Sequence, residues 1–194
     1  MRIGQVPHRY YPSVGGIENY VRRLKGSLER RGHEVNVYTT DFGIPKRAEL
    51  ERGVFYCRTN IAIHRNPFSG ELLRRLRGSD DDIYHLHSPW FFPSLFGARI
   101  LDRKPKVMTV HGARIGVGPM LSVLSLLYHP FARQVLHNMD KIIALTKSER
   151  DYLVHRFELP RRKVVVVPNG VEVESFRARP GAVGEFIQKH GLKE

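Results

Sequence analysis

The chain has 194 residues, 41% of them hydrophobic, which is enough for one sizeable core. Its formal net charge of +13 indicates anionic partners: nucleic acid, a phospholipid surface or a phosphorylated small molecule. The single cysteine, Cys57, excludes an internal disulfide, and no apolar run reaches the roughly 18 residues of a membrane span. Because the first residues already have the pattern of a core strand rather than a leader, we expect a cytoplasmic protein.

Apolar runs of strand length alternate with helical patterns along the chain. Strands are predicted at residues 2–6, 34–40, 61–65, 82–88, 106–112, 141–147 and 163–170. Helices are predicted at 17–28, 90–103, 119–138 (kinked or split by Pro130), 148–157 and 181–190, with Gly32 closing the first and residues 41–57 forming a loop or small hairpin. This alternation predicts an α/β fold: a Rossmann-like, open, mainly parallel sheet with helices on both faces.

Two consecutive glycines, Gly15 and Gly16, precede the first helix. The first-turn N–H groups of Ile17, Glu18 and Asn19 are expected to be unpaired and to point, with the positive end of the helix dipole, toward the carboxyl edge of the sheet. Phosphate could bind there, because residues without side chains allow a ligand to approach the backbone. The alternative is only a tight turn, since neither a spaced dinucleotide fingerprint nor a Walker loop is present.

Histidines mark the ends of two predicted strands. His85 and His87 lie on the same side of one strand, yet a zinc site needs a further ligand of suitable spacing and none is near, so we predict no metal. His87 and Ser88 end that strand, at the edge where open parallel sheets bind ligands, whereas His85 is expected to pack beneath a helix.

His111 ends the next strand along the chain and is followed at once by Gly112. A neutral imidazole there can donate or accept a hydrogen bond to a sugar hydroxyl or to a leaving phosphate. The alternative is a strand-end histidine that bonds a neighbouring backbone group. No Gly-x-Ser-x-Gly elbow accompanies it, which argues against acyl hydrolysis.

Two later motifs have structural explanations when taken alone. In "ALTKSERDYL" Thr146 or Ser148 caps a helix, and in "VVPNGVEVESF" the residues 168–170 end a valine-rich strand in a turn.

In their order along the chain, these motifs resemble the N-terminal half of the GT-B glycosyltransferases, specifically the family-four retaining enzymes of the glycosyl transferase group 1 type, which include phosphatidylinositol mannosyltransferases. The stretches that carry the resemblance are residues 12–37, 82–88, 110–112, 142–149 and 164–176. The resemblance implies two Rossmann-like domains across a cleft: residues 1–176 as the acceptor-binding domain, and 177–194 as a linker into a donor-binding domain.

The resemblance also implies roles for individual residues. Gly15, Gly16 and Asn169 would bind the donor and its phosphates, His111 would be catalytic and bond the transferred sugar, and His87, Ser88 and Trp90 would border the acceptor pocket. The co-substrate would be a nucleotide-sugar such as a GDP- or UDP-sugar, with no metal. We expect this half alone to transfer little or no sugar.

The acceptor is implied only as a class: a lipid-linked, phosphorylated or carbohydrate molecule. The apolar residues 120–128 on a basic domain indicate peripheral contact with an anionic membrane at the inner face of the cell, or else the segment packs on the sheet. A different function, a non-enzymatic anion- or nucleic-acid-binding α/β module, rests on net charge alone and has no recognised nucleic-acid motif.

Overall fold

The computed structural model describes residues 1–44, 51–112, 119–171 and 181–192, with the side chains of 119–125 outside this description. Seven strands in this part of the chain form one parallel sheet in the order β3-β2-β1-β6-β7-β8-β9. They are β1 (Arg2–Val6), β2 (Glu34–Thr40), β3 (Val54–Cys57), β6 (Ile83–His87), β7 (Lys106–Thr109), β8 (Lys141–Ala144) and β9 (Val164–Val166). The order of the strands reverses between β1 and β6, which confirms the predicted Rossmann-like α/β fold.

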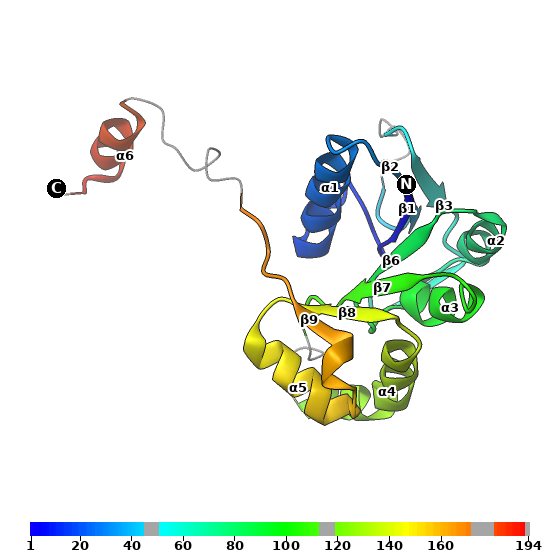
Figure 1. The fold of residues 1–194 in the computed structure, drawn as a ribbon. Helices are drawn as coiled ribbons and strands as arrows, with labels where there is room; N and C mark the ends of the chain where they lie inside the picture. The colour runs from blue at the N-terminus through cyan, green and yellow to red at the C-terminus, as the bar shows by residue number, and fades with distance from the viewer. Residues whose placement is uncertain (45–50, 113–118, 172–180, 193–194) are drawn as a thin grey trace.

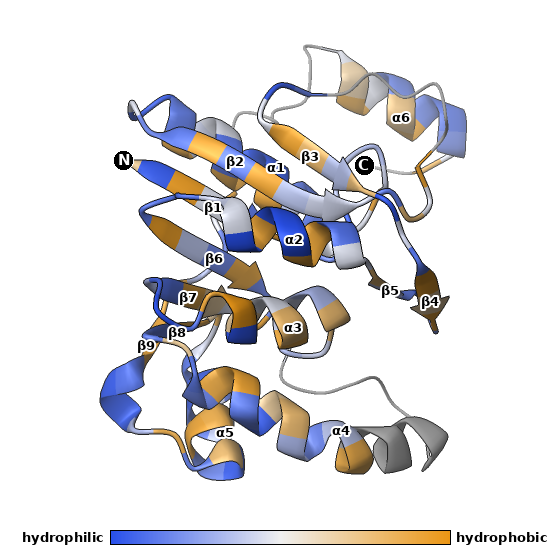
Figure 2. Cartoon of the chain, turned by 90° about the vertical axis from the view of Figure 1, so that its right-hand side faces the viewer, coloured by the Kyte–Doolittle hydropathy of each residue, from blue (hydrophilic) through white to orange (hydrophobic). Residues whose placement is uncertain are grey.

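Helices cover both faces of this sheet (Figure 1). The helices that do so are α1 (Gly16–Glu29), α2 (Gly70–Gly78), α3 (Phe92–Ile100), α4 (Pro119–His137) and α5 (Lys147–Phe157). The short η1 (Arg161–Lys163) and α6 (Ala182–His190) follow along the chain. Figure 2 shows α2 and α3 in front of the strands and α1 behind them. Gly32 has φ +82°, the left-handed conformation expected of the residue that closes α1.

The prediction that residues 61–65 belong to the parallel sheet was wrong. β4 (Ile61–Ile63) pairs in antiparallel fashion with β5 (Asn66–Phe68) in a separate two-stranded sheet. His64 and Arg65 both have positive φ, which makes the tight turn that joins two such short strands. Because this turn forms, the apolar run cannot continue as a core strand.

The edge strand of the parallel sheet is β3, which lies inside the segment predicted as a loop or hairpin, residues 41–57. Its residues pair with β2 from Val37↔Val54 to Thr40↔Cys57. Part of that predicted loop, 45–50, lies outside the described residues. The run Val54–Cys57 is β-branched and aromatic, so residue preference favours a strand although the run is too short to show alternation.

Helix α2 was missed in the sequence. It begins after Ser69, whose hydroxyl accepts a hydrogen bond from the backbone N–H of Leu72 at 3.1 Å. Leu72 and Leu76 are both fully buried, four residues apart on the face that packs on the sheet and on α3. The capping serine and this leucine spacing were the available signal.

Helix α4 continues through Pro130 without being split. Within the described ranges, no helix has the length and hydropathy needed to cross a membrane. Leu126 and Leu127 on α4 are 65% and 66% exposed, so these two side chains do not pack on the sheet. Tyr128, at the end of the predicted apolar segment, is partly buried against the core, and the side chains of 120–125 lie outside the described part.

The core lies between the central strands and the helix layer of α2 to α5. Val6, Leu86, Met108 and Ile142 come from β1, β6, β7 and β8 and belong to one buried cluster. Parallel pairing sets His85 beside Gln5 on one side, and His87 beside Thr109 on the other. The register therefore brings the carboxyl ends of β1, β6 and β7 to one edge of the sheet.

Candidate functional site

Three polar side chains form a hydrogen-bonded chain at this carboxyl edge. Nε2 of His87 lies 2.7 Å from Oε1 of Gln5, and Nδ1 of His87 lies 3.0 Å from Nε2 of His111. Gln5 is the last residue but one of β1. The order of the strands reverses between β1 and β6, and doubly wound sheets bind ligands at such a point. Gln5 and His87 are fully buried, while His111 is partly exposed.

Burial keeps these imidazoles neutral. It lowers the pKa of His111 from 6.5 to about 4, and it holds the pKa of His87 well below its ordinary value. For His87, the neighbouring rings of His85 and His111 act in the same direction, because one positive charge disfavours another. Neutral rings of this kind can both donate and accept hydrogen bonds at ordinary pH.

Two further histidines, His85 and His8, lie near these hydrogen-bonded side chains. His85 is buried, and its Nε2 lies 2.8 Å from Oγ1 of Thr109, so a strand hydroxyl satisfies it. His8 stacks on Phe91 with ring centroids 3.6 Å apart, and burial lowers its pKa to about 3. His8 was missed in the sequence, because it follows β1 in a stretch without regular periodicity.

The strand ends at this edge turn sharply. Ser88 and His111 both have left-handed φ values, +65° and +54°, and Gly112 has φ +111°. Non-glycine residues in that region cost about 1–3 kcal/mol each and are concentrated at functional sites. The indole N–H of Trp90 donates to the carbonyl oxygen of Gly112 at 3.1 Å, which joins the two turns.

At the turn before α1, Gly15 is required by a contact within the protein, whereas the sequence suggested room for a phosphate or only a tight turn. The Glu18 carboxylate is buried and pairs with the Arg9 guanidinium at 2.8 Å. A Cβ added at Gly15 would lie 2.2 Å from Oε2 of Glu18, so this glycine makes room for the protein's own carboxylate. The backbone N–H of Asn19, expected to be free, donates to the carbonyl oxygen of Gly15 at 3.0 Å.

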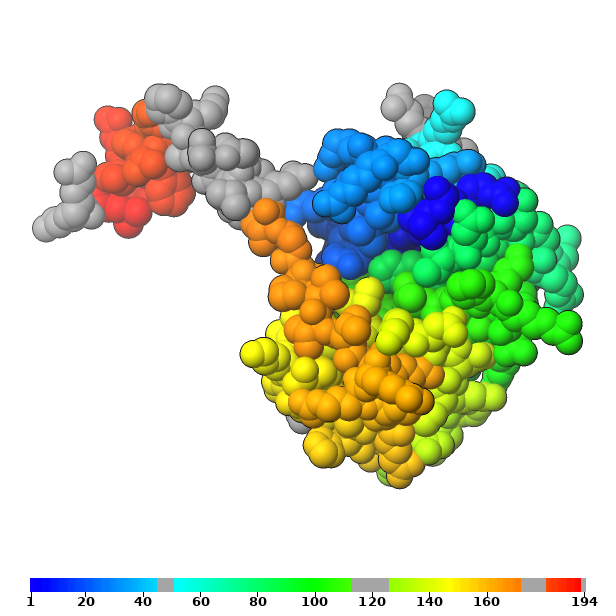
Figure 3. All heavy atoms as spheres, viewed as in Figure 1, coloured from blue at the N-terminus to red at the C-terminus, as the bar shows by residue number. Residues whose placement is uncertain are grey.

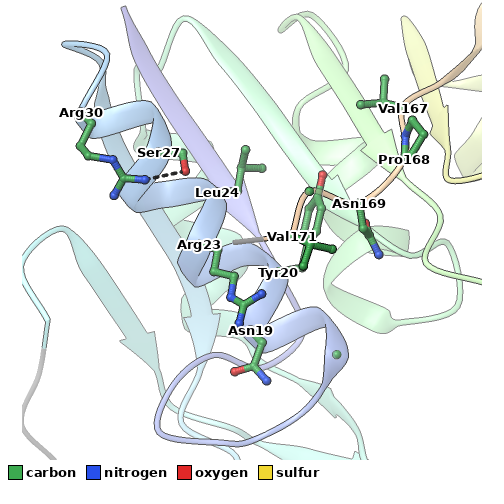
Figure 4. A pocket seen from close by; sticks show the side chains of 12 residues that line it. Asn19, Tyr20, Arg23, Leu24, Ser27, Arg30, Val167, Pro168, Asn169 and Val171 are labelled. Atoms are coloured by element: carbon green, nitrogen blue, oxygen red, sulfur yellow. Dashed lines mark hydrogen bonds between the residues drawn. The ribbon is translucent and has the colours of Figure 1, made fainter. Parts of the chain in front are cut away.

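A cavity of about 470 Å³ lies between α1 and the segment that follows β9. It is lined by Gly16, Asn19, Tyr20, Arg23, Leu24, Ser27, Arg30 and residues 167–171. In Figure 3 the molecule is hollowed between the blue residues of α1 and the orange residues after β9. Figure 4 shows Tyr20 and Asn169 facing each other across it.

Tyr20 connects this cavity to the histidines. Its ring meets that of His111 edge-on with centroids 4.7 Å apart, and that of His87 at 5.9 Å. A Cβ added at Gly16 would meet no atom within 4 Å, so open space faces this residue. The cavity thus combines bare backbone, two arginines and two side-chain amides beside a group of neutral imidazoles.

The sequence places the chain among known proteins. A family model described as Glycosyltransferase Family 4 matches residues 14–175. The chain belongs to Glycosyltransferase Family 4. This confirms the resemblance stated from the motifs.

Curated relatives of this family-four chain are named as glycosyltransferases. An uncharacterized glycosyltransferase of Methanocaldococcus jannaschii is 28% identical over 91% of this chain and 48% of its own length. A phosphatidyl-myo-inositol mannosyltransferase of Mycobacterium leprae is 26% identical over 95% of this chain and 49% of its own. The chain therefore spans about half the length of the curated relatives it matches.

Solved structures show the same fold. The Anabaena protein HepE in complex with UDP superposes on 98% of this chain and 50% of its own, with a TM-score of 0.69 and 16% identity. Sucrose-phosphate synthase from Thermosynechococcus elongatus covers 95% of this chain and 52% of its own, with a TM-score of 0.64 and 16% identity. The family-four chain has the fold of the N-terminal half of GT-B glycosyltransferases.

The structure brings most of the predicted site residues of this family-four chain to one region. Gly16 and Asn169 line the same cavity, and His111 reaches it through Tyr20. His87 and Ser88 lie at the same edge but are buried, 0% and 2% exposed, so neither side chain presents a surface to an acceptor. Trp90 is partly exposed and packs near Tyr128 and Phe157.

Besides His8, sequence reasoning missed three contributors to this region: Gln5, Tyr20 and Glu149. Gln5 was hidden because an apolar strand pattern absorbed it, and Tyr20 because its spacing assigned it to the apolar stripe of α1. Glu149 lies in the first turn of α5, where acidic residues are common, so its sequence position gives no sign that its carboxylate accepts a hydrogen bond from the backbone N–H of Gly112 at 3.0 Å. The described residues contain no group of three or more His, Cys, Asp or Glu side chains arranged to hold a metal ion.

Proposed function

We propose that this chain is the acceptor-side, N-terminal half of a retaining glycosyltransferase, which moves a sugar from a nucleotide-sugar to an acceptor. Residues 1–176 form this half, and 177–194 lead into a second, donor-binding domain. The observation that carries the proposal is the cavity in which Gly16 and Asn169 meet beside His111. Relatives about twice as long as this chain support the second domain.

The cavity suits the charged part of a nucleotide-sugar. Arg23 and Arg30 line it, and the unobstructed backbone at Gly16 begins α1, whose dipole favours negative charge at that end. Asn169 faces this wall with an amide that can donate or accept. In the reaction these groups would stabilise the departing diphosphate, which is the main electrostatic demand of such a transfer.

His111 is the residue that we assign to the transferred sugar. It is partly exposed, neutral and held at the edge of the sheet, so it can bond a hydroxyl group. His87 lies directly beneath it and supports it, in place of the direct acceptor contact expected from the sequence. Ser88 shapes the neighbouring turn, and Trp90 closes one side of it.

For the acceptor we propose a lipid-linked or phosphorylated molecule reached at an anionic membrane surface on the cytoplasmic side. The support is the net charge of +13 together with exposed Leu126, Leu127 and Phe131 on α4. Co-sedimentation with anionic vesicles, but not with neutral ones, is the expected result. Equal binding to both would remove the membrane from the proposal.

The activity is tested by joining the chain to its natural downstream sequence and measuring sugar transfer from a panel of UDP- and GDP-sugars. The substitution His111→Ala is expected to lower the rate by about a hundredfold or more, the usual loss on removing one transition-state contact. The exposed His155 provides a matched control, and His155→Ala should leave the rate unchanged. Undiminished transfer by His111→Ala would remove His111 from the site, and no transfer from any donor would remove the activity.

A further inference from the structure

The hydrogen bonds of the chain Gln5–His87–His111 have a fixed direction. The atom of Gln5 that faces His87 is its amide oxygen, Oε1, at 2.7 Å from Nε2. An amide oxygen only accepts, so Nε2 of His87 carries the proton of that bond. Because a neutral imidazole carries one N–H, Nδ1 of His87 is left with a lone pair.

The second bond follows from the first. Nδ1 of His87 lies 3.0 Å from Nε2 of His111, and with no proton of its own it must accept. Nε2 of His111 is therefore the donor. His111 is neutral as well, so its remaining nitrogen, Nδ1, holds a lone pair. Among the described residues, none forms a hydrogen bond with this Nδ1, which leaves it for a ligand.

We propose that Gln5 and His87 are positioning residues that fix His111 in the tautomer with its proton on Nε2, so that Nδ1 accepts a hydrogen bond from a hydroxyl group of the sugar. The ligand role rests on the proposed function; the tautomer itself does not. Neither Gln5 nor His87 is exposed, so both act through His111 and not on the substrate.

This direction decides which ligand group His111 can bind. A lone pair on Nδ1 accepts from a sugar hydroxyl and meets a phosphate oxygen as one acceptor facing another, which is unfavourable. The sequence left both partners open for this imidazole. The hydrogen-bonded chain Gln5–His87–His111, called the relay below, therefore favours a hydroxyl group as the partner of His111. The diphosphate is left to the arginines and the bare backbone that line the cavity.

The orientation of the Gln5 amide sets the direction of both hydrogen bonds in the relay. Its Nε2 is buried and has no partner in the described part of the chain. An amide turned by 180° would offer a donor to His87, and every donor and acceptor along the chain would exchange. The tautomer of His111 therefore reports the orientation of a side chain that no ligand touches.

The experiment is nitrogen NMR of the 194-residue chain labelled at its histidine rings, without any ligand. Two-bond couplings identify which ring nitrogen bears the proton, and His111→Gln assigns the signals of His111 among the 10 histidines. We expect the Nε2–H tautomer at His111 in roughly tenfold excess or more, as a buried hydrogen bond of ordinary strength predicts. A predominant Nδ1–H tautomer would overturn the proposal.

A variant tests the dependence on Gln5. Gln5→Met keeps the size of the side chain but removes the acceptor, so a proton on Nε2 of His87 would be buried without a partner. His87 should therefore carry its proton on Nδ1 and donate to His111, which raises the share of the Nδ1–H tautomer at His111. Thr109→Val is the matched control, because it removes the partner of the neighbouring His85 and leaves the relay intact. Inversion in the first variant alone supports the relay, and an unchanged His111 in Gln5→Met contradicts it.

Two safeguards keep the result interpretable. If Gln5→Met does not fold, the tautomer of the unsubstituted chain still decides the proposal. The NMR measurement contains no sugar, so a wrong tautomer at His111 would contradict only the proposed hydrogen-bond direction. A lack of sugar transfer would contradict only the proposed function.

Discussion

The backbone N–H of Gly112 donates to Oε1 of Glu149 at 3.0 Å, across 37 positions of the chain. The other oxygen of this carboxylate accepts from the backbone N–H of Leu145 at 2.6 Å. One side chain thus joins the turn after β7, which holds His111, to the turn after β8. The contact fixes the backbone one residue after His111, the candidate catalytic residue.

We expect Glu149→Ala to lower the free energy of unfolding by about 1–3 kcal/mol, since it leaves two backbone donors without their charged acceptor. Urea denaturation of the 194-residue chain measures this loss. Asp151→Ala is the control on the same helix, because its carboxylate is 45% exposed and solvent screens its ion pairs, so this substitution should cost clearly less than Glu149→Ala. Equal effects of the two substitutions would contradict the bridging role.

The two glycines before α1 should respond differently to alanine. Gly15 has φ −178°, a conformation open to any residue, but a Cβ there meets the Glu18 carboxylate. Gly15→Ala should therefore displace Glu18 from Arg9 and destabilise the chain, by about 3–5 kcal/mol if the buried pair separates. Denaturant unfolding measures the difference between the variants.

Gly16→Ala should keep the stability or raise it, because open space faces this residue and alanine favours helix. It should nevertheless weaken binding of UDP or GDP to the complete enzyme, since the methyl group enters the cavity. A Gly16→Ala protein with unchanged nucleotide affinity would show that the ligand does not approach this part of α1.

Much of the fold follows from local pattern. β1 and β2 have the predicted bounds because each is a short apolar run closed by turn residues, and α5 begins at a capping threonine, Thr146, as its sequence indicates. The prediction that residues 61–65 join the parallel sheet was wrong because local composition does not determine which strand an apolar run pairs with. β3 carries the same kind of signal and pairs with β2, while β4 forms a hairpin.

The sequence predicts where the strands end, and therefore which residues lie at the carboxyl edge of the sheet. Parallel strands collect their carboxyl ends at one edge, which is why His87 and His111, at the ends of β6 and β7, lie within hydrogen-bond distance of each other. Which side chain is buried there depends on register and layers, and a sequence pattern contains neither. The full burial of His87 and the contact between Tyr20 and His111 could be found only in three dimensions.

Asn66 joins the β4–β5 hairpin to the site. Its amide donates to the carbonyl oxygen of Trp90 at 3.2 Å, and its oxygen accepts from the backbone N–H of Phe92 at 2.8 Å. We expect Asn66→Ala to loosen this segment and to shift the fluorescence of Trp90, the single tryptophan, toward longer wavelength. Asn60→Ala, which removes a contact to Gly70 elsewhere, is the control and should leave the emission unchanged.

The buried histidines predict how stability depends on pH. The pKa values of His8 and His85 fall to about 3 and that of His111 to about 4, against 6.5 in the unfolded chain. Below pH 6.5 the unfolded chain therefore binds more protons than the folded one. The stability present above pH 6.5 is lost as pH falls toward these lowered values, by up to roughly 1.4 kcal/mol per pH unit for each histidine.

Urea unfolding between pH 7 and pH 5 measures this slope. His8→Gln removes one of the titrating groups, so its free energy of unfolding should fall less steeply with decreasing pH than that of the unsubstituted chain, by up to roughly 1.4 kcal/mol per pH unit near pH 5. Above about pH 8 these rings are neutral in both the folded and the unfolded chain and contribute almost no slope, which supplies an internal reference. Identical slopes between pH 7 and pH 5 would show that His8 does not titrate differently on folding.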